Sequence, residues 1–311
     1  MKRLIIINPK SRHGKSLKIF RKLEPSLRDL LGEYELYETT AAKDCTEKVR
    51  SVLLRQEYEQ ILIAGGDGSI NEAVNGYFTE EAAPINSNVP IGIINLGTGG
   101  DFIKTMQANS PNYYQALQQN RYQKVDCGIS YLKAFSKAYH FANISSIGMA
   151  GDINISMKAS SFQYGILAYF WHTLKVFSRY QAPRCTIRIK SKEGKWYETK
   201  STLMNFFACN GQYNGGGMHW APNSSIQNGE LDFVLIEGIS KWKLFFDSYK
   251  VYSGKVDAMA GTRLFRGSEA HIISEGYTSQ ELDGEVREMD GKEYPLEFHF
   301  KVLPQQIPFN F

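Results

Sequence analysis

The chain has few cysteines, no long apolar run and no signal segment. Its four cysteines are far apart, form no CxxC pair, and so predict reduced thiols rather than a disulfide framework or a zinc site. No apolar stretch approaches the ~18 residues that span a bilayer. The basic start is followed by only four apolar residues before Asn8, which is too short for a signal peptide. We therefore expect a cytoplasmic protein whose contact with membranes is peripheral.

The excess of charge of one sign is also small, because 36 Lys and Arg face 32 Asp and Glu. The net charge is +4 and the sequence pI is about 8.7, which permits an anionic ligand or membrane surface but does not favour nucleic acid. No Walker A motif is present, so a P-loop enzyme is excluded. The 311 residues, 42% hydrophobic and 22% charged, predict a globular protein of two domains.

The most informative stretch begins with the apolar run Ile61–Ala64. Gly65 and Gly66 stop this run, Asp67 follows, and a helical segment then opens. A glycine turn before a helix N-terminus suits phosphate. Asp67 would repel phosphate unless a divalent cation lay between them. The stretch therefore indicates a nucleotide-phosphate loop with a metal-facing acid, and the alternative is a Gly-Asp turn that serves geometry alone.

The first half of the chain alternates strands with helices. The predicted strands are Leu4–Ile7, Tyr34–Tyr37, Ile61–Ala64 and Pro90–Leu96. The predicted helices are Ser16–Leu31, one from an N-cap at Asp44 to about Gln56, Asn71–Phe78, and another after Phe102. This alternation indicates a parallel sheet, and three Gly- or Ser-containing loops follow its strands at the end where such sheets bind ligands.

After Asn120 short alternating runs replace the helical pattern and predict an antiparallel β-sandwich. These runs are Lys124–Asp126, His140–Ser145, Thr186–Lys190, Trp196–Phe207, Leu231–Glu237, Ala270–Ser274, Gln280–Asp283 and Leu296–Leu303. Two helical inserts interrupt them, at about Phe162–Arg179 and Lys241–Tyr252. The aromatic first insert suits a membrane surface or an acyl chain, and a helix packed on the sandwich is the alternative. Lys15, Lys18, Arg21 and Lys22 favour an anionic lipid surface or form a solvated helix face.

Several of these motifs resemble one family. Gly65–Glu72 resembles the GGDG[ST]xNE signature of the diacylglycerol kinase catalytic domain family, which includes sphingosine, ceramide and soluble bacterial lipid kinases. Asn8–Gly14 resembles its NPxSG loop with a two-residue insertion, and Gly97–Lys104 resembles GTxNDFAR with Gly100 in place of Asn. Asn210–Pro222 resembles NGxYxGGGxxxAP. Asp283–Glu285 matches the catalytic DGE, although an isolated Asp-Gly pair predicts a hairpin tip.

The resemblance implies a fold of two domains. An α/β ATP-binding domain of the NAD kinase and diacylglycerol kinase type, residues 1–123, would be followed by an antiparallel β-sandwich lipid-substrate domain, residues 124–303. The tail, residues 304–311, would return to the first domain. ATP would lie in the cleft between the two domains.

The resemblance also implies the site residues. Glu285 would be the general base, Asp283 an orienting group or second metal contact, and Asp67 the contact to the Mg²⁺ that accompanies ATP. A structural cation found in some members would lie at Ser225, Asn228 and Glu230, although Asn228 replaces their Asp and an Asn-Gly turn is the alternative. The implied ATP contacts are Asn8, Pro9, Ser11, Gly14, Thr40, Gly65, Gly66, Asp67, Gly68, Ser69, Asn71, Glu72, Gly97, Thr98 and Asp101.

We therefore predict an ATP-dependent lipid kinase that meets its lipid substrate at a membrane surface. Diacylglycerol is the favoured acceptor, and phosphatidylglycerol, a sphingoid base or another lipid alcohol stays open. The alternatives are a NAD kinase and a catalytically silent lipid- or nucleotide-binding protein. The oligomeric state is left open between a monomer and a homodimer.

Overall fold

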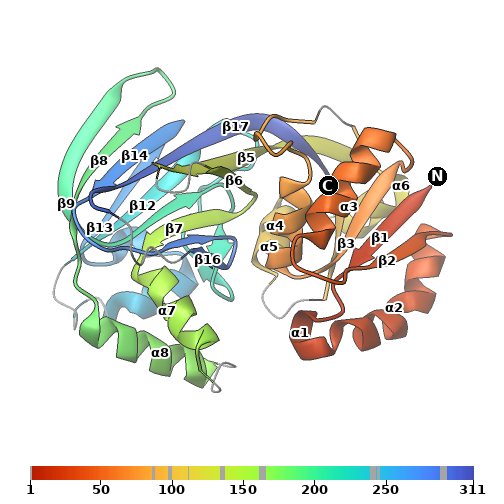
Figure 1. Cartoon of the computed structure of the whole chain (residues 1–311), viewed down its shortest axis with the longest axis horizontal. Helices are drawn as coiled ribbons and strands as arrows, with labels where there is room; N and C mark the ends of the chain where they lie inside the picture. The colour runs from red at the N-terminus through yellow and green to blue at the C-terminus, as the bar shows by residue number, and fades with distance from the viewer. Residues whose placement is uncertain are drawn as a thin grey trace.

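The computed structural model describes residues 2–85, 88–96, 100–110, 112–133, 137–160, 166–238, 243, 246–287 and 293–311. Its first part is a parallel sheet in the order β4-β3-β1-β2, flanked by helices (Figure 1). The strands are β1 (Arg3–Ile7), β2 (Glu35–Glu38), β3 (Gln60–Gly65) and β4 (Ile91–Asn95). Every residue of β1 and β3 is buried, as expected for parallel strands covered on both faces.

The connecting helices carry the chain back across this sheet. They are α1 (Ser11–Gly14), α2 (Ser16–Leu31), α3 (Asp44–Arg55), α4 (Asp67–Asn75), α5 (Asp101–Asn109) and α6 (Tyr113–Gln119). Their apolar faces and the strands share one core that includes Phe20, Val49 and Phe102. Figure 1 shows α4 and α5 between the parallel sheet and the rest of the molecule.

The second part is a β-sandwich. Its strands are β5 (Tyr122–Leu132), β6 (Lys137–Phe141), β7 (Ile144–Gly148), β8 (Arg184–Lys190), β9 (Trp196–Cys209), β10 (Tyr213–Asn214), β11 (Met218–His219), β12 (Leu231–Glu237), β13 (Thr262–Gly267), β14 (Glu269–Ser274), β15 (Gln280–Leu282), β16 (Glu285–Arg287) and β17 (Leu296–Asn310). One layer contains β6, β5, β17, β14 and β8, and the other contains β16, β15, β7, β12 and β13. A core that includes Phe206, Phe233 and Phe300 fills the space between them.

Two long strands connect the layers and the two parts. The first half of β9 pairs with β8, and its second half pairs with β7 and β12, so β9 passes from one layer to the other. β17 pairs along its length with β5 and reaches β4, where Phe309 is the parallel partner of Ile91. The tail is therefore the end of a strand, and Phe309 is buried in the core of the first part.

Helices cover the outer side of the second layer (Figure 1). They are α7 (Met149–Lys158), α8 (Ile166–Arg179) and the 3₁₀ segments η2 (Ser248–Ser253) and η3 (Val256–Ala258). A third apolar cluster, which includes Ile153, Phe207 and Val251, lies between these helices and the sheet. Among the described helices, none is both long and apolar enough to cross a membrane.

The sandwich, the parallel sheet and helix α8 confirm the predicted fold, but several predicted bounds are wrong. Asp44 is not the N-cap of α3, because Lys43 holds that position and the Asp44 carboxylate accepts hydrogen bonds from Thr40 instead. The helix predicted at Asn71–Phe78 runs from Asp67 to Asn75. The run His140–Ser145 is two strands, β6 and β7, separated by a turn.

Candidate active site

The Gly-Asp-Gly loop is shorter than predicted, because only Gly66 separates β3 from α4. A Cβ atom on Gly65 would lie 2.5 Å from the Ser69 side-chain oxygen, so the chain needs glycine there to turn from strand to helix. The N–H of Ser69 donates to the Gly66 carbonyl at 3.0 Å, whereas the amides of Asp67 and Gly68 before it have no partner within the helix. The start of α4 therefore presents free N–H groups and a positive dipole end, which suit a phosphate.

Asp67 joins this loop to the next one. Its carboxylate accepts hydrogen bonds from the backbone N–H of Asp101 at 3.1 Å and of Phe102 at 3.0 Å, at the start of α5. Burial raises the pKa of Asp67, and the nearby Asp101 carboxylate raises it further. Two acids therefore lie close together where two helices begin, and a cation there would reduce their mutual repulsion.

Asp101 is buried and links the two parts of the molecule. Lys104 approaches it at 3.2 Å, and the backbone N–H of Gly216 donates to its other oxygen at 2.8 Å. Gly216 belongs to the triple-glycine loop of the sandwich. Gly100, which stands where the family pattern has Asn, is left-handed with φ 58°, and a Cβ there would lie 2.4 Å from the Asn95 amide nitrogen. Gly97 and Thr98 lie outside the described residues.

Hydrogen bonds to Asn8 hold the first predicted loop in shape. The carbonyl of Asn8 accepts from the hydroxyls of Ser11 at 2.9 Å and Ser16 at 2.7 Å, and the Asn8 amide oxygen accepts from the Lys10 N–H. Gly14 has a positive φ of 76°. This turn follows β1 as the Gly65 turn follows β3, so the two turns lie at the carboxyl ends of neighbouring strands.

Two other residues predicted to contact ATP make hydrogen bonds within the chain. The Thr40 hydroxyl donates to Asp44 at 3.0 Å, and the Glu72 carboxylate accepts from the backbone N–H of Lys43 at 3.2 Å. Both residues therefore shape the approach to α3. Their contact with a nucleotide stays a prediction.

The DGE motif forms a two-residue hairpin between β15 and β16. Leu282 and Glu285 are paired across it, and both turn residues have positive φ, 46° for Asp283 and 91° for Gly284. Such a turn is the common hairpin type for Asp-Gly. The structure describes the backbone of Glu285 but not its side chain.

The Asp283 side chain points into the protein rather than into solvent. Each of its oxygens accepts two N–H groups: Oδ1 from Asn143 and Ile144, both at 3.0 Å, and Oδ2 from Ala142 at 2.9 Å and the Asn71 amide at 3.0 Å. Burial raises the pKa of Asp283 to about 6, against these hydrogen bonds, which lower it. Asp283 therefore fixes the hairpin against the turn between β6 and β7.

Asn71, whose contact with ATP stays a prediction, lies on α4 and faces the sandwich. Its amide donates to Asp283 and to the carbonyl of His140 at 3.1 Å. One turn along α4, Asn75 donates to the same carbonyl at 3.0 Å and accepts from the His140 N–H at 3.1 Å. Neither Asn75 nor His140 was predicted from the sequence. The repeat of Asn at i and i+4 on one helix face was the signal that could have shown them.

An apolar cavity of about 350 Å³ lies beside the hairpin, between α7, α8, η2 and the second sheet layer. Its wall includes Ile153, Phe177, Phe207 and Trp220. Glu281, two residues before Asp283, and the Asn214–Gly215 loop also line it. Burial raises the pKa of Glu281, which accepts from Asn214 and Ser146 at 3.3 Å each. The cavity therefore suits an apolar ligand with a polar end near the DGE hairpin.

The predicted cation loop contains a set of internal contacts. The Lys192 ammonium donates to the Asn228 carbonyl at 3.0 Å, the Asn228 side chain accepts from Glu230 N–H, and Ser225 accepts from Gln227 N–H. Buried Asp126, which no sequence motif indicated, accepts from Gly229 N–H at 2.7 Å. No group of three His, Cys, Asp or Glu side chains in the described part of the chain could hold a metal ion. A cation at this loop stays a prediction.

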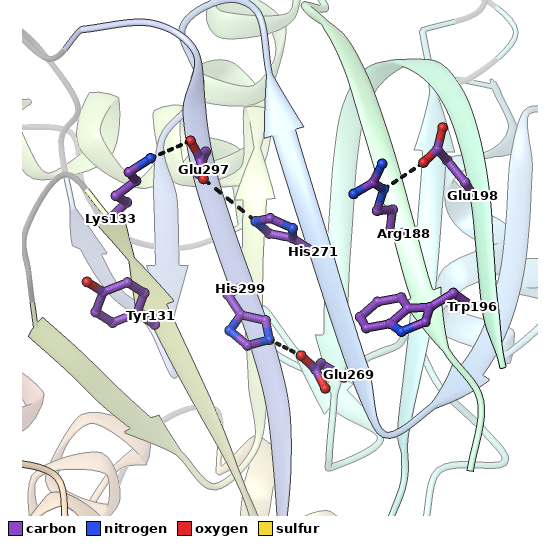
Figure 2. Close-up of a pocket in the computed structure, with 9 residues that line it drawn as sticks. All are labelled: Tyr131, Lys133, Arg188, Trp196, Glu198, Glu269, His271, Glu297 and His299. Carbon is purple, nitrogen blue, oxygen red and sulfur yellow. Dashed lines mark hydrogen bonds and ion pairs between the residues drawn. The ribbon is translucent and has the colours of Figure 1, made fainter. Parts of the chain in front are cut away.

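A second hollow, of about 590 Å³, lies on the outer face of the first sandwich layer, and its described lining includes no residue of the glycine loops (Figure 2). His271 and His299 are cross-strand neighbours there. His299 contacts Glu269 at 2.5 Å, and His271 lies 3.9 Å from Glu297. These contacts give the hollow imidazole–carboxylate pairs, but no loop with phosphate-binding character reaches it. The candidate site is therefore the region where α4 contacts the start of α5 through Asp67 and the hairpin through Asn71.

Comparisons with known proteins agree with this geometry. Residues 2–129 match the diacylglycerol kinase catalytic domain, and residues 143–309 match the YegS C-terminal NAD kinase beta sandwich-like domain. Diacylglycerol kinase of Bacillus subtilis is 26% identical over 244 residues, which cover 75% of this chain and 73% of that protein. Sphingoid long-chain bases kinase 1 of Arabidopsis thaliana is 34% identical over 177 residues, which cover 54% of this chain but 22% of that protein.

A solved structure of a diacylglycerol kinase from Bacillus anthracis has the same fold. It superposes with a TM-score of 0.65 at 18% identity and covers 100% of this chain and 96% of that one. The two family models together account for nearly all of the α/β part and the sandwich described above. This chain is therefore an ATP-dependent kinase of the diacylglycerol kinase catalytic domain family.

Proposed function

We propose that this kinase transfers the γ-phosphoryl group of ATP to the hydroxyl of a lipid alcohol, with diacylglycerol as the favoured acceptor and phosphatidic acid as the product. The observation that carries the proposal is the apolar cavity beside the DGE hairpin. Asn214 and Gly215 line it, and the backbone N–H of the next residue, Gly216, donates to Asp101 of the phosphate-loop region. An acyl chain in the cavity would therefore leave its hydroxyl facing the phosphate loops.

Residues 1–123 would bind ATP, and residues 124–303 would bind the lipid. The turn after β1, the start of α4 and the start of α5 would surround the phosphates. Positioning and charge neutralisation do most of the work in phosphoryl transfer. Backbone amides at the start of α4 and Lys104 beside Asp101 supply positive charge at this place.

The residues present fit a Mg²⁺ ion that enters with ATP. Asp67 and Asp101 are neighbouring acids, and burial raises the pKa of Asp67, with the Asp101 charge raising it further. Mg²⁺ is commonly held by one or two carboxylates together with water and phosphate oxygens. When bound, the ion would neutralise charge on the phosphates. Asp67 would hold the ion. If both carboxylate oxygens keep their hydrogen bonds to α5, a water molecule would lie between Asp67 and the ion.

Glu285 would take the proton from the acceptor hydroxyl as its oxygen attacks the γ-phosphorus, and ADP would leave. Asp283 would act as a positioning residue, because its four N–H contacts fix the hairpin that carries Glu285. We expect Glu285→Gln to lower kcat by at least ~10²-fold while the affinity for ATP stays unchanged. Turnover of that variant at the wild-type rate would remove Glu285 from the mechanism.

The test of the function is transfer of ³²P from Mg·ATP in a panel of acceptors. The panel contains diacylglycerol, phosphatidylglycerol and a sphingoid base in mixed micelles, together with NAD. We expect one labelled lipid, and that lipid names the acceptor. Label found only in NADP would make the protein a NAD kinase. Absence of label in every acceptor, with ATP still bound, would favour a silent binding protein or an acceptor missing from the panel.

A further inference from the structure

Three exposed aromatic side chains follow one another along the segment that ends the second helical layer. Phe246, Tyr249 and Tyr252 are 68%, 67% and 60% exposed. They are spaced by three, and Tyr249 and Tyr252 lie in the 3₁₀ segment η2. Side chains three apart are aligned in a 3₁₀ helix, so Tyr249 and Tyr252 lie on the same side of η2, and Phe246 comes three residues before Tyr249, just ahead of this segment. We call Phe246, Tyr249 and Tyr252 the aromatic ridge.

The ridge stands at the edge of the apolar cavity. Ser248 and Val251, on the other side of η2, line that cavity, and Val251 is buried. Tyr252 both lines the cavity and is exposed. In Figure 1 the pale blue helical turns of this segment lie on the same side of the sandwich as α7 and α8. The cavity and the ridge therefore share a border.

Lysines continue the spacing at each end of the ridge. Lys243 precedes Phe246 by three residues and Lys255 follows Tyr252 by three, and both are exposed. Lys250 is occupied by Asp247 at 2.8 Å, and Asp257 is the other acid of this segment. Counting residues 243 and 246–258, three lysines and two aspartates leave a charge of +1. Aromatic side chains flanked by lysines are typical of surfaces that lie in the headgroup region of a bilayer.

The exposed area of the ridge is too small for a stable protein partner. Side chains of 150–250 Å² that are two-thirds exposed offer about 400 Å² in total, against about 800 Å² on each side of a standard interface. A bilayer needs no matching surface and accepts a narrow line of aromatic rings. The size, the charge and the shared border with the cavity all favour a membrane.

We propose that the aromatic ridge docks this kinase on a bilayer that contains anionic lipid, and that the acceptor enters the cavity beside it. The second half of this statement rests on the proposed lipid kinase activity, whereas docking itself does not. The rings insert among the headgroups, and Lys243 and Lys255 contact their phosphates.

Vesicle flotation of the full chain tests the docking. The vesicles are phosphatidylcholine alone and phosphatidylcholine mixed with phosphatidylglycerol. We expect Phe246→Ser/Tyr249→Ser to bind the mixed vesicles at least about tenfold more weakly, a change of about 1.4 kcal/mol. The matched control is Leu54→Ser/Tyr114→Ser, which removes side chains that are 66% and 61% exposed on α3 and α6. Equal binding by the ridge variant and the wild type would overturn the proposal.

A charge variant checks the result independently of ring removal. Lys243→Glu/Lys255→Glu keeps the ridge, and we expect it to lose the preference for phosphatidylglycerol while it binds phosphatidylcholine as before. An unchanged preference would contradict the assignment of these lysines. If the ridge variant is monomeric, the wild type dimeric, and vesicle binding equal, the ridge is a contact between two copies and not a membrane surface.

Kinase assays separate this proposal from the proposed function. The ridge variant should phosphorylate a short-chain diacylglycerol dissolved as monomers at the wild-type rate, and a long-chain diacylglycerol in vesicles more slowly. If the wild type phosphorylates no lipid but still binds vesicles through the ridge, the lipid kinase function fails and the docking surface stands. If the wild type is active and the ridge variant loses neither vesicle binding nor vesicle activity, the docking surface fails alone.

Discussion

At the scale of single residues, the chain buries several carboxyl groups at and near the candidate site. Burial raises the pKa of Asp67, Asp126, Glu281 and Asp283, and it raises that of Asp283 to about 6. Burying a charged carboxylate costs free energy. At Asp283 hydrogen bonds offset part of this cost, because each carboxylate oxygen accepts two N–H groups. A proton on either oxygen would displace a donor, so the hairpin geometry belongs to the ionised form.

This burial predicts an unusual dependence of stability on pH. The Asp283 carboxyl has a pKa of about 6 in the folded chain, against an ordinary value of 3.8. The folded state therefore binds more protons between these values, and the unfolding free energy from this group rises as pH falls from 6 to 4. This contribution of Asp283 to the unfolding free energy is lost as pH rises through 6. The difference for one group is about 3 kcal/mol, and urea unfolding at a series of pH values measures it.

The control for this prediction is Asp283→Asn, which cannot titrate. The unfolding free energy of the wild type minus that of the variant should increase below pH 6, regardless of how the other acids titrate. A difference that is flat between pH 4 and 7 would show that Asp283 titrates normally. The rate of phosphoryl transfer should fall over the same range, because the protonated group no longer holds the hairpin.

At the scale of elements, the turn from β3 into α4 depends on one glycine. Gly65→Ala would place its Cβ 2.5 Å from the Ser69 oxygen and 2.7 Å from the Ser69 Cβ, so the start of α4 must shift. We expect a loss of about 1–3 kcal/mol in unfolding free energy and a clear loss of ATP affinity. Thermal unfolding and calorimetric titration with ATP measure the two effects.

The second variant in this test is Gly65→Ala/Ser69→Gly. Removing the Ser69 side chain makes room for the new Cβ, so ATP affinity should recover, although glycine inside α4 costs about 1 kcal/mol of stability. If the double variant binds ATP no better than Gly65→Ala, the contact with Ser69 is not the cause of the loss.

The sequence predicted the elements whose patterns are strong. β1, β3 and β4 were placed within a residue or two of their ends, because continuous apolar runs stop at Asn8, Gly65 and Leu96. α7 was missed, since Met149–Lys158 contains Gly, Asn and isoleucines that do not favour a helix. Packing against β7 and β9 decides its structure instead.

The candidate site also has features that a local pattern predicts and features that it does not. Motifs predicted the turns at Asn8, Gly65 and Asp283, because glycine and Asp-Gly pairs specify backbone geometry. They could not predict that Asn71 donates to Asp283 from a distance of 212 residues, or that Asp126 meets Gly229. Contacts of this kind join residues far apart in the sequence and depend on tertiary packing, which no local pattern contains.

At the scale of the whole molecule, Asn71 and Asn75 hold the α/β part to the sandwich through the backbone of His140. We expect Asn71→Ala/Asn75→Ala to raise hydrogen exchange in β6 and in the hairpin, and to lower kcat much more than ATP affinity. The reason is that the phosphate loop stays folded while the hairpin loses its support.

Asn223→Ala, at an exposed position in the sandwich, is the matched control for this pair and should change neither quantity. Exchange in β6 equal to that of the wild type would show that the two asparagines do not couple the parts. A parallel loss of ATP affinity and kcat would place them in nucleotide binding, as the family resemblance implies for Asn71.

The path of β17 has a consequence for how the protein is made. Phe309 completes the core of the first part, and the Asn310 side chain accepts from Gln60 at 2.8 Å. Residues 1–123 leave the ribosome long before residue 310 does. The nascent α/β part therefore lacks the end of β17 until that strand has been synthesised. Productive nucleotide binding should therefore appear late in synthesis, and the two parts should gain their final stability together. A chain stalled after residue 123 that binds ATP as tightly as the finished protein would contradict this order.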